Sequence, residues 1–451
     1  MTSSSFSGLT NALAALNVQR YGMEVTGQNI ANANTAGYTR QRAELAAVGP
    51  VSGVAALYAT QHPNGSVTVS GTTRLNDPMI DVRARTEHGD NGYRQTTANV
   101  LSSTETLFDE PSDHGLAEQL NDFWNSWAAV ANNPRDLAAR NVVLQKAAGL
   151  ASSLNQSSAN LGRLTQSESL EAAAATVEIN TAATALAEVN GQIAVATASG
   201  TNTNALADQR DGLLMKLADL TGAQTTILAD GTATVSVGGQ SLVSSTTAST
   251  LSLSPSNQIL VDGTPAGPAG GSLQGLVDSL TTVLPGYAAQ LDAVAAALVS
   301  TVNAGQTSGY DLAGNPGGPL FAGSTAATLS VVVTDPATLA ASGTPGGNLD
   351  GSVALGTSQL GGSNSGADAA YRTLVGTLAS DVQRALQQAA VQQAVTNSVD
   401  ELAQSSAGVS FDEETTNLLT YQRAYQASSR VLTTVDEILD TLISHTGRVG
   451  L

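Results

Sequence analysis

The chain of 451 residues contains no cysteine, which excludes disulfide bonds and thiolate metal sites. Its four histidines are far apart along the chain, so a metal site would have to collect them from separate regions. We therefore expect solvent-exposed histidines at His62, His88, His114 and His445. Neither a G-x-S-x-G nor an H-E-x-x-H motif is present. The sequence predicts no catalytic residues, no cofactor-binding residues and no metal site, and hence not an enzyme.

Basic residues are few and scattered. The sequence has 18 Lys and Arg against 37 Asp and Glu, a formal net charge of -19. Phosphate backbones and anionic lipid surfaces would on average repel such a chain. We expect no nucleic-acid partner and no membrane partner.

Long apolar runs are also missing. No stretch approaches the eighteen consecutive apolar residues typical of a membrane span. The first nineteen residues contain no Lys or Arg, and the apolar run 12–16 is too short for a signal-peptide core. Export, if it occurs, is expected without a cleaved general secretory signal.

Aromatic residues make up only 4% of the chain, so few bulky side chains are available for one thick core. What is abundant is Ala, Leu, Val and small polar residues in helical patterns. Long helical segments are predicted over 76–222, 272–304 and 368–405, one of them beginning at Asn133-Pro134. Asp208, Arg210 and Asp211 are interpreted as local ion pairs on a solvated helix.

Between these helices the pattern changes. Residues 223–271 alternate β-branched and small residues around Asp230-Gly231 and Gly238-Gly239, which indicates hairpins. Residues 305–363 are rich in Gly, Pro, Asn and Ser around a short predicted strand at 329–334. We interpret both segments as β-rich outer inserts.

The two ends of the chain share one periodicity. Apolar residues alternate at spacings of three and four, as in the seam of a coiled coil, with interruptions at Arg20 and Gly27. The N-terminal seam residues are Phe6, Leu9, Leu13, Leu16, Met23 and Ile30. The C-terminal seam residues are Leu418, Tyr421, Tyr425, Leu432, Val435, Leu439 and Leu442. Chain ends are usually frayed unless something ties them down, so two such seams predict terminal helices that pair and assemble with neighbours.

A specific turn follows the first helix in NIANANTAGYTRQR (29–42). Asn29 and Asn32 lie on one helical face, where their amides can bond to another backbone. Gly37 can adopt the left-handed conformation that ends a helix. Tyr38 then supplies an anchor with a polar tip. By composition alone this is a helix C-cap and turn.

The predicted fold is mainly α with β inserts. We expect paired terminal coiled-coil helices (1–45 with 412–451) and an elongated helical-bundle domain (46–222 with 272–304 and 364–411). A small antiparallel β outer domain, in one or two parts, is expected from 223–271 and 305–363.

The spacing N-x-x-N-x-x-T-x-G-Y, formed by Asn29, Asn32, Thr35, Gly37 and Tyr38, resembles the N-terminal signature of flagellar axial proteins. This group comprises rod, hook and hook-associated proteins. Three further stretches, 123–151, 204–222 and 408–444, are similar to the hook-associated protein 1 family.

That resemblance implies a structural adaptor of the bacterial flagellum, a homo-oligomeric layer at the distal end of the hook. Its implied partners are itself, the hook protein, the next hook-associated protein and a cytosolic export chaperone. The chaperone would bind the C-terminal helix, Leu418 to Leu442 here. It also implies export through the flagellar type III channel, so that the protein is transiently cytoplasmic and then extracellular.

Two alternatives remain open. The first is a hook or distal-rod subunit of the same axial group, which shares the signature and both terminal helices. The second is an extracellular enzyme or adhesin carried on axial-protein ends.

Overall fold

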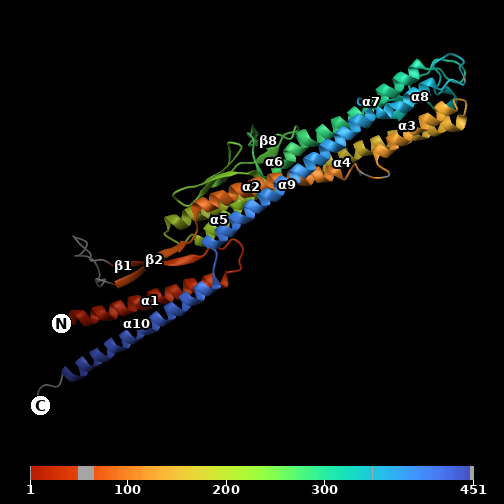
Figure 1. Ribbon diagram of the computed structural model, residues 1–451. Helices are drawn as coiled ribbons and strands as arrows, with labels where there is room; N and C mark the ends of the chain where they lie inside the picture. Colours follow the sequence, from red (N-terminus) through yellow and green to blue (C-terminus); the bar gives the residue numbers. More distant parts are fainter. Residues whose placement is uncertain are drawn as a thin grey trace.

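The computed structural model describes residues 2–48, 66–108, 110, 112, 114–347 and 349–446. The molecule is a long rod, with both chain ends together at one end of it (Figure 1). The N-terminal helix and the C-terminal helix lie side by side there, apart from the main body. The segments between them form the rod.

Helices, several of them long, make up most of the rod (Figure 1). They are α2 (Pro78–Glu105), α3 (Leu116–Asn132), α4 (Leu137–Ala198), α5 (Asn204–Thr221), α6 (Gly271–Asp278), α7 (Leu284–Ser308), α8 (Ser352–Ser358) and α9 (Ala367–Ala407). Helix α4 alone has 62 residues and so extends about 93 Å at 1.5 Å per residue. The prediction of a mainly α fold with small antiparallel β inserts is confirmed.

The core of the rod is aliphatic, as the scarcity of aromatic residues predicts. Leu154, Ile179 and Leu186 of α4 are fully buried, and Leu374 of α9 is also fully buried. Phe123, Trp124, Trp127 and Phe321 form a cluster of rings at the end of the rod far from the chain ends, where the rings of Phe123 and Phe321 lie 6.0 Å apart. Many small contacts along the axis therefore stabilise the rod.

Capping residues set the helix ends. Asp77 and Asp136 precede α2 and α4, and each accepts a hydrogen bond from the backbone two residues on. The prediction that the long helix begins at Asn133-Pro134 is wrong by three residues. Asn133 to Asp136 form the turn after α3, and the Asp136 carboxylate provides the cap.

Residues 223–271 form two small antiparallel sheets that pack on α4. The strands are β3 (Gln224–Ile227), β4 (Ala233–Val237), β5 (Gln240–Ser244), β6 (Thr247–Ala248), β7 (Leu251–Leu253), β8 (Ile259–Val261) and β9 (Thr264–Pro265). The two predicted turns are present, with φ of +84° at Gly231 and +83° at Gly239.

Two asparagines of α4 hold these sheets to the helix. The Asn190 side chain donates to the Ala233 carbonyl (2.8 Å) and accepts from the Ala233 amide (2.9 Å). Asn180 makes the same pair of bonds with Leu251, both at 2.8 Å. Each amide thus satisfies a strand's backbone as a neighbouring strand would.

Residues 305–363 differ from the prediction of a β-rich insert. They contain two strands of two residues, β10 (Phe321–Ala322) and β11 (Ser330–Val331), and also the short helix α8. Side-chain amides replace strand pairing here: Gln306 bonds to the amide and carbonyl of Ala340, at 3.0 and 2.9 Å. The segment folds over the distal end of the bundle in this way.

A hairpin near the N-terminus was not predicted. Strands β1 (Gln41–Val48) and β2 (Ser66–Arg74) pair antiparallel, with a register shift after Glu44. The hairpin lies against the N-terminal helix, where the hydroxyls of Tyr21 and Thr72 are 2.6 Å apart. Residues 46–48 and 66–74 therefore differ from the expectation that they belong to the elongated helical domain, because they are strand residues.

One continuous helical segment, 271–308, is long and apolar enough by length and composition to cross a membrane. It comprises α6, a π-helical turn (Ser279–Val283) and α7. Leu291, Val294 and Leu298 of this segment are buried in the same core as α4 and α9. Packing within the bundle therefore accounts for its apolar character.

His88 contradicts the expectation of solvent-exposed histidines. Its Nδ1 lies 2.9 Å from Asp219 of α5 and its Nε2 lies 3.0 Å from Asp400 of α9, so it joins three helices. Hydrogen bonding to Asp219, and then to Asp400, outweighs burial and raises the pKa of His88 to about 9. His114 is exposed. His62 and the side chain of His445 lie outside the described residues.

We predict that the stability of the rod falls as pH rises from about 6.5 to about 9. The pKa of His88 is higher in the folded than in the unfolded chain, so its contribution is complete below pH 6.5 and is lost above the folded value. We expect a change of about 1–2 kcal/mol, typical of partly exposed charge-assisted bonds.

Urea midpoints followed by circular dichroism at several pH values measure this effect. His88→Gln should lack this part of the pH dependence, whereas the control His114→Gln should retain it. An unchanged pH profile for His88→Gln would contradict the assignment.

Candidate functional site

The two terminal helices, α1 (Thr2–Ala31) and α10 (Phe411–Thr446), form an antiparallel pair (Figure 1). Three contacts give the register. A Cβ on Gly8 would lie 3.9 Å from Val435, and one on Gly22 would lie 2.6 Å from the Tyr421 ring. At the inner end, Asn29 Nδ2 is 3.0 Å from Glu414 Oε2. The chain ends are therefore in contact along most of their helical length.

The predicted C-terminal seam lies largely on the side of α10 that faces α1. Leu418, Tyr421, Leu432, Val435 and Leu439 are all partly buried. Tyr425 is more open, with 38% of its surface exposed. The Leu442 side chain lies outside the described residues.

On α1 the most buried positions differ from the predicted spacing. Ala12, Val18 and Val25 are buried, as is Gly22 beneath Tyr421. Small residues such as Ala12 and Gly22 let the two helices approach closely. The predicted seam contains only large apolar residues and therefore does not include them.

The N-terminal seam residues flank this buried face. Leu13 is 46% exposed. Leu9, Leu16, Met23 and Ile30 are partly buried, and the Phe6 side chain lies outside the described residues.

Asn29 is the centre of a buried polar joint between the helix pair and the rest of the chain. It is 1% exposed. Its Nδ2 donates to the Gln41 carbonyl (2.8 Å) and to Glu414 Oε2, and its Oδ1 accepts from the Gln41 amide (3.0 Å). The Tyr38 hydroxyl also donates to Oδ1, at 2.9 Å. One side chain thus fixes the end of α1, the start of β1 and the start of α10.

Tyr38 remains a donor in this joint at any physiological pH. Burial, followed by the negative charges of Asp208 and Glu414, raises its pKa to about 12. The predicted role of Tyr38 as an anchor with a polar tip matches this position.

The left-handed Gly37 that the sequence predicts is present in the turn between α1 and β1, but it does not end the helix, because α1 ends at Ala31. Gly37 has φ of +77°, in the left-handed region. Asn32 differs from Asn29, because its amide donates to the Gln28 carbonyl of its own helix and its Oδ1 accepts from Thr35. Only one of the two asparagines therefore bonds across to another segment.

Arg40 ties the same turn to α10. It forms ion pairs with Glu413 (2.6 Å) and with Glu414 (2.7 Å), and the Glu414 side chain is only 2% exposed. Its backbone amide also donates to the carbonyl of Ala407, the last residue of α9, at 2.9 Å. The Ser410 hydroxyl accepts from the Glu413 amide at 3.4 Å, as in a capping box, but the Glu413 carboxylate pairs with Arg40.

A second ionic layer connects the joint to the rod, and it corrects the interpretation of 208–211 as a solvated helix face. Arg74 of β2 binds Asp208 (2.8 Å) and Asp211 (2.7 Å) of α5, and its side chain is only 10% exposed. Arg210 is buried and bonds to Asp211. Burial raises the pKa of Asp208, and Arg74 opposes this rise. Asp208 and Asp211 are thus paired with Arg74 of a distant element, whereas Arg210 and Asp211 form the predicted local pair.

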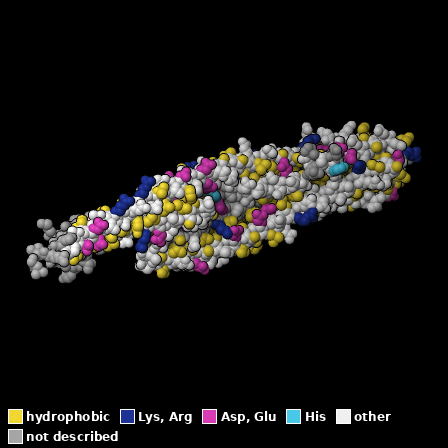
Figure 2. Space-filling view, turned by 90° about the horizontal axis from the view of Figure 1, so that it is seen from below, with side chains coloured by type: hydrophobic (Ala, Val, Ile, Leu, Met, Phe, Trp, Pro, Cys, Tyr) yellow, Lys and Arg dark blue, Asp and Glu magenta, His cyan; other side chains and the backbone are white. Residues whose placement is uncertain are grey.

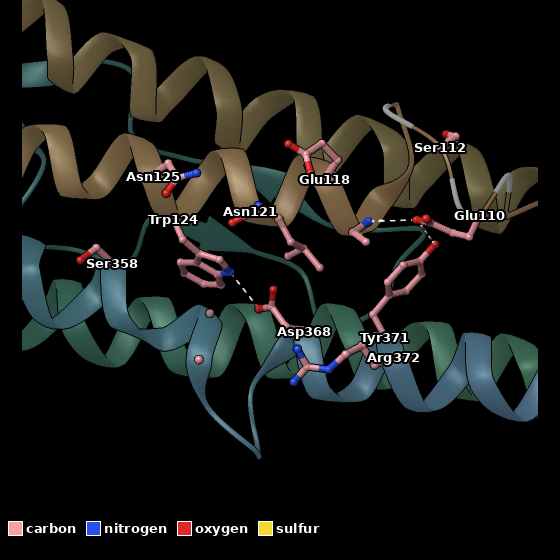
Figure 3. A pocket seen from close by; sticks show the side chains of 14 residues that line it. Glu110, Ser112, Glu118, Asn121, Trp124, Asn125, Ser358, Asp368, Tyr371 and Arg372 are labelled. Carbon is pink, nitrogen blue, oxygen red and sulfur yellow. Dashed lines mark hydrogen bonds between the residues drawn. The ribbon is translucent and has the colours of Figure 1, made fainter.

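A hollow of about 590 Å³ lies at the distal part of the rod, between α3 and α9 (Figure 3). Its polar groups bind one another: Trp124 Nε1 donates to Asp368 (2.8 Å), and the Tyr371 hydroxyl donates to Glu110 (3.0 Å). Glu110 also accepts from the Ala117 amide, near the start of α3. These contacts attach α3 to α9.

Two protein-family models match the chain, one in the helical rod and one at its C-terminal helix. The family model for the flagellar hook-associated protein FlgK helical domain matches residues 101–321. The model for the C-terminal region of flagellar basal body rod FlgEFG proteins matches residues 403–444.

Flagellar hook-associated protein 1 of Bacillus subtilis (strain 168) is 30% identical over 505 aligned positions, and the alignment covers 99% of each chain. The protein of the same name from Escherichia coli (strain K12) is 28% identical over 335 positions, which cover 70% of this chain and 59% of that one.

Among solved structures, the flagellar hook junction protein FlgK from Burkholderia pseudomallei superposes with a TM-score of 0.64 at 18% identity. The match covers 73% of this chain and all of that one, and it supports the fold.

The helical rod with paired chain ends and these matches together give the class: this is a structural protein of the flagellum. Within that class, the chain belongs to the flagellar hook-associated protein 1 family. It is a component of the bacterial flagellum, and its family is not an enzyme family.

We predict that Asn29→Ala loosens the terminal pair by about 2–4 kcal/mol, because several buried partners each lose a hydrogen bond. Native-state hydrogen exchange of amides in α1 and α10 measures this local stability. The matched control Asn32→Ala should stay within about 0.5 kcal/mol, since Asn32 bonds within its own turn. Equal effects of the two substitutions would contradict the role of Asn29.

Proposed function

We propose that this chain is a structural adaptor that assembles at the distal end of the hook and forms the hook-filament junction. The observation that carries the proposal is the paired terminal helices, which are held at one end of a long rod by a buried polar joint. Such an arrangement presents both chain ends together for packing against other subunits. The Burkholderia pseudomallei protein of the same fold is described as a hook junction protein.

The terminal pair would form the assembly interface, mainly with further copies of this chain. The pair carries apolar surface that α1 and α10 do not bury in each other: Leu13 and Tyr425 remain 46% and 38% exposed, and Leu419 is 54% exposed. Burying such surface between many copies contributes about 25 cal/mol per Å². A layer of copies would thus be more stable than an isolated pair of helices.

We divide the chain accordingly into an assembly domain (1–45 with 412–451), an elongated helical domain (46–222, 272–304 and 364–411) and outer inserts (223–271 and 305–363). Insert 223–271 lies along the flank of the rod, on the half nearer to the terminal pair, and insert 305–363 lies at the far end (Figure 1). They would add lateral contacts or shape to the layer.

The further partners in this proposal are the hook protein on one side and the next hook-associated protein on the other. The chain would reach this position from the cytoplasm by flagellar type III export and would end outside the cell. A cytosolic chaperone would bind α10 during export, in a helix-in-groove mode that uses Leu418 to Leu442.

A hook or distal-rod subunit is the alternative from the same group. The rod-protein model matches only the C-terminal region, 403–444, which the axial proteins share. The hook-associated helical-domain model covers 101–321 and includes most of the bundle. An enzyme or adhesin on axial ends would need an outer domain with a functional pocket, and the distal hollow is instead crossed by structural hydrogen bonds.

Electron microscopy of cells that lack this protein, with flagellin measured in the medium, tests the proposal. We expect complete hooks without filaments, together with flagellin lost to the medium, and recovery when the wild-type chain is supplied. Absent or truncated hooks would instead indicate the alternative, a hook or distal-rod subunit. Normal filaments would contradict the proposed function altogether.

A further inference from the structure

A buried arginine without an ion pair lies near the ionic layer that connects the joint to the rod. Arg85 of α2 is only 6% exposed, and its Nε has no hydrogen-bond partner. No carboxylate lies within 4.0 Å of its guanidinium in the part of the chain that the structure describes. An arginine in a protein stays protonated, so Arg85 is a buried positive charge with unused donors. Buried charges are normally paired and hydrogen-bonded.

The two carboxylates whose charges reach Arg85 already bind other groups. Asp211 binds two other arginines, each at 2.7 Å. Asp81 accepts a hydrogen bond from Asn76 at 2.8 Å. Burial lowers the pKa of Arg85, and the charges of Asp211 and Asp81 only partly oppose this effect. The chain itself therefore stabilises this buried charge incompletely.

Arg85 lines a hollow of about 470 Å³ between α2, the end of α5 and the small sheets. Much of the wall of this hollow is glycine: Gly222, Gly238, Gly239, Gly267 and Gly270. The backbones are in close contact there, because a Cβ on Gly222 would lie only 2.6 Å from the Cα of Gly270. No side chain projects from this part of the wall, so the hollow stays open beside Arg85.

Two further polar side chains line the same hollow. Gln224 of β3 and Ser236 of β4 are partners in the antiparallel register, so they lie next to each other on one face of the sheet. Neither side chain forms a hydrogen bond with any other residue that the structure describes. A guanidinium, an amide and a hydroxyl thus supply unused donors around one space.

Asp90 also lines the hollow and limits which anions it can hold. It is exposed and lies about 140° around α2 from the buried Arg85, so it is toward the mouth. A carboxylate at the mouth repels an anion with two charges, such as phosphate, more than an anion with one. A carboxylate ligand carries one charge, and its two oxygens match the guanidinium fork.

We propose that the hollow beside Arg85 is a binding site for a carboxylate group. The Arg85 guanidinium would donate two charge-assisted hydrogen bonds, and Gln224 and Ser236 would donate further ones. Pairing of the buried charge favours binding.

The carboxylate has two possible sources. One is a small carboxylic acid in solution. The other is an acidic side chain of another copy of this chain, since acidic side chains are spread along the length of the molecule (Figure 2).

Titration of the purified chain with sodium acetate tests the site directly. Arginine side chains labelled with ¹⁵N report binding through the Nε–H signal of Arg85, which is identified by its loss in Arg85→Met. At constant ionic strength, we expect a saturable shift of this signal with half-saturation at about 1–50 mM acetate. Inorganic phosphate should bind about fivefold more weakly or less, because of Asp90.

Two results of this titration would overturn the inference. An Arg85 signal that acetate does not shift, or shifts no more than chloride does, would mean that the hollow holds no carboxylate. Tighter binding of phosphate than of acetate would mean that the class of ligand is wrong.

Thermal unfolding gives a second readout with a matched control. Acetate at about 0.1 M should raise the Tm of the wild-type chain by about 1–3 °C relative to chloride, because it binds the folded chain only. Arg85→Met should abolish this difference. Arg83→Met removes an exposed arginine from the same helix and should retain it. An equal acetate effect in both variants would contradict the role of Arg85.

Gln224→Glu tests the site without changing a buried residue. It is an exposed position, and its added carboxylate beside Arg85 should weaken acetate binding about tenfold. The control Gln156→Glu makes the same change in charge at an exposed position of α4 and should bind acetate as the wild type does. Unchanged acetate binding by Gln224→Glu would overturn the location of the site.

Sedimentation velocity distinguishes the two sources of the carboxylate. If another copy supplies it, the wild-type chain will self-associate at high concentration, acetate will separate the copies, and Arg85→Met will remain monomeric. If it comes from solution, the chain will stay monomeric while acetate saturates the Arg85 signal. Either pattern supports the carboxylate site, and self-association that neither acetate nor Arg85→Met reduces would reject another copy as the source.

These measurements use the isolated chain and do not depend on the hook-filament junction. An Arg85 site that fails to bind carboxylate would leave the proposed function unchanged. Cells without the protein that keep normal filaments would contradict the proposed function and leave the Arg85 site unchanged.

Discussion

The structure depends on the buried contact between the Asn29 amide and the Glu414 carboxylate. These residues come from opposite ends of the chain, and both are almost fully buried. A buried carboxylate is stable only when it is paired and hydrogen-bonded. Asn29 and Arg40 satisfy it, and both belong to the segment that leaves α1 and enters β1. Pairing of the chain ends and the turn that follows α1 therefore form together.

From that joint the polar contacts continue into the rod. Arg74 joins the hairpin to α5, and His88 joins α2 to α5 and α9. Side-chain amides of Asn180 and Asn190 attach the small sheets to α4 in place of further strands. A chain with few aromatic residues thus maintains a long, thin shape through an aliphatic core and polar cross-links between distant elements.

Much of the fold follows from local patterns in the sequence. Long helices within 76–222, the hairpin turns at Gly231 and Gly239, and the left-handed Gly37 are all present. These features depend on spacing and on backbone conformation, which neighbouring residues largely determine. The two terminal helices, α1 and α10, were also predicted, because the heptad spacing of their apolar residues is regular over several turns.

The features that were not predicted share a different cause, because each of them depends on contacts between residues that are distant in sequence. Gly22 and Ala12 form the tight face of α1 only because Tyr421 and its neighbours lie opposite them. Asp208 is half of an ion pair with Arg74 that no spacing within α5 reveals. His88 becomes a cross-link once two carboxylates from other helices meet it. The sequence predicted that the Asn29 amide bonds to the backbone of another segment, and it does so with Gln41. Its second partner, the Glu414 carboxylate, could not be predicted, because Glu414 is distant in sequence.

A double-mutant cycle between Arg40 and Glu414 tests the central claim most directly. The local stability of α10 would be measured by hydrogen exchange in the wild-type chain, in Arg40→Gln, in Glu414→Gln and in the double variant. A buried ionic joint predicts a coupling free energy of about 1.5 kcal/mol or more between the two sites. Additive effects, with coupling below about 0.5 kcal/mol, would mean that the chain ends pair without this joint.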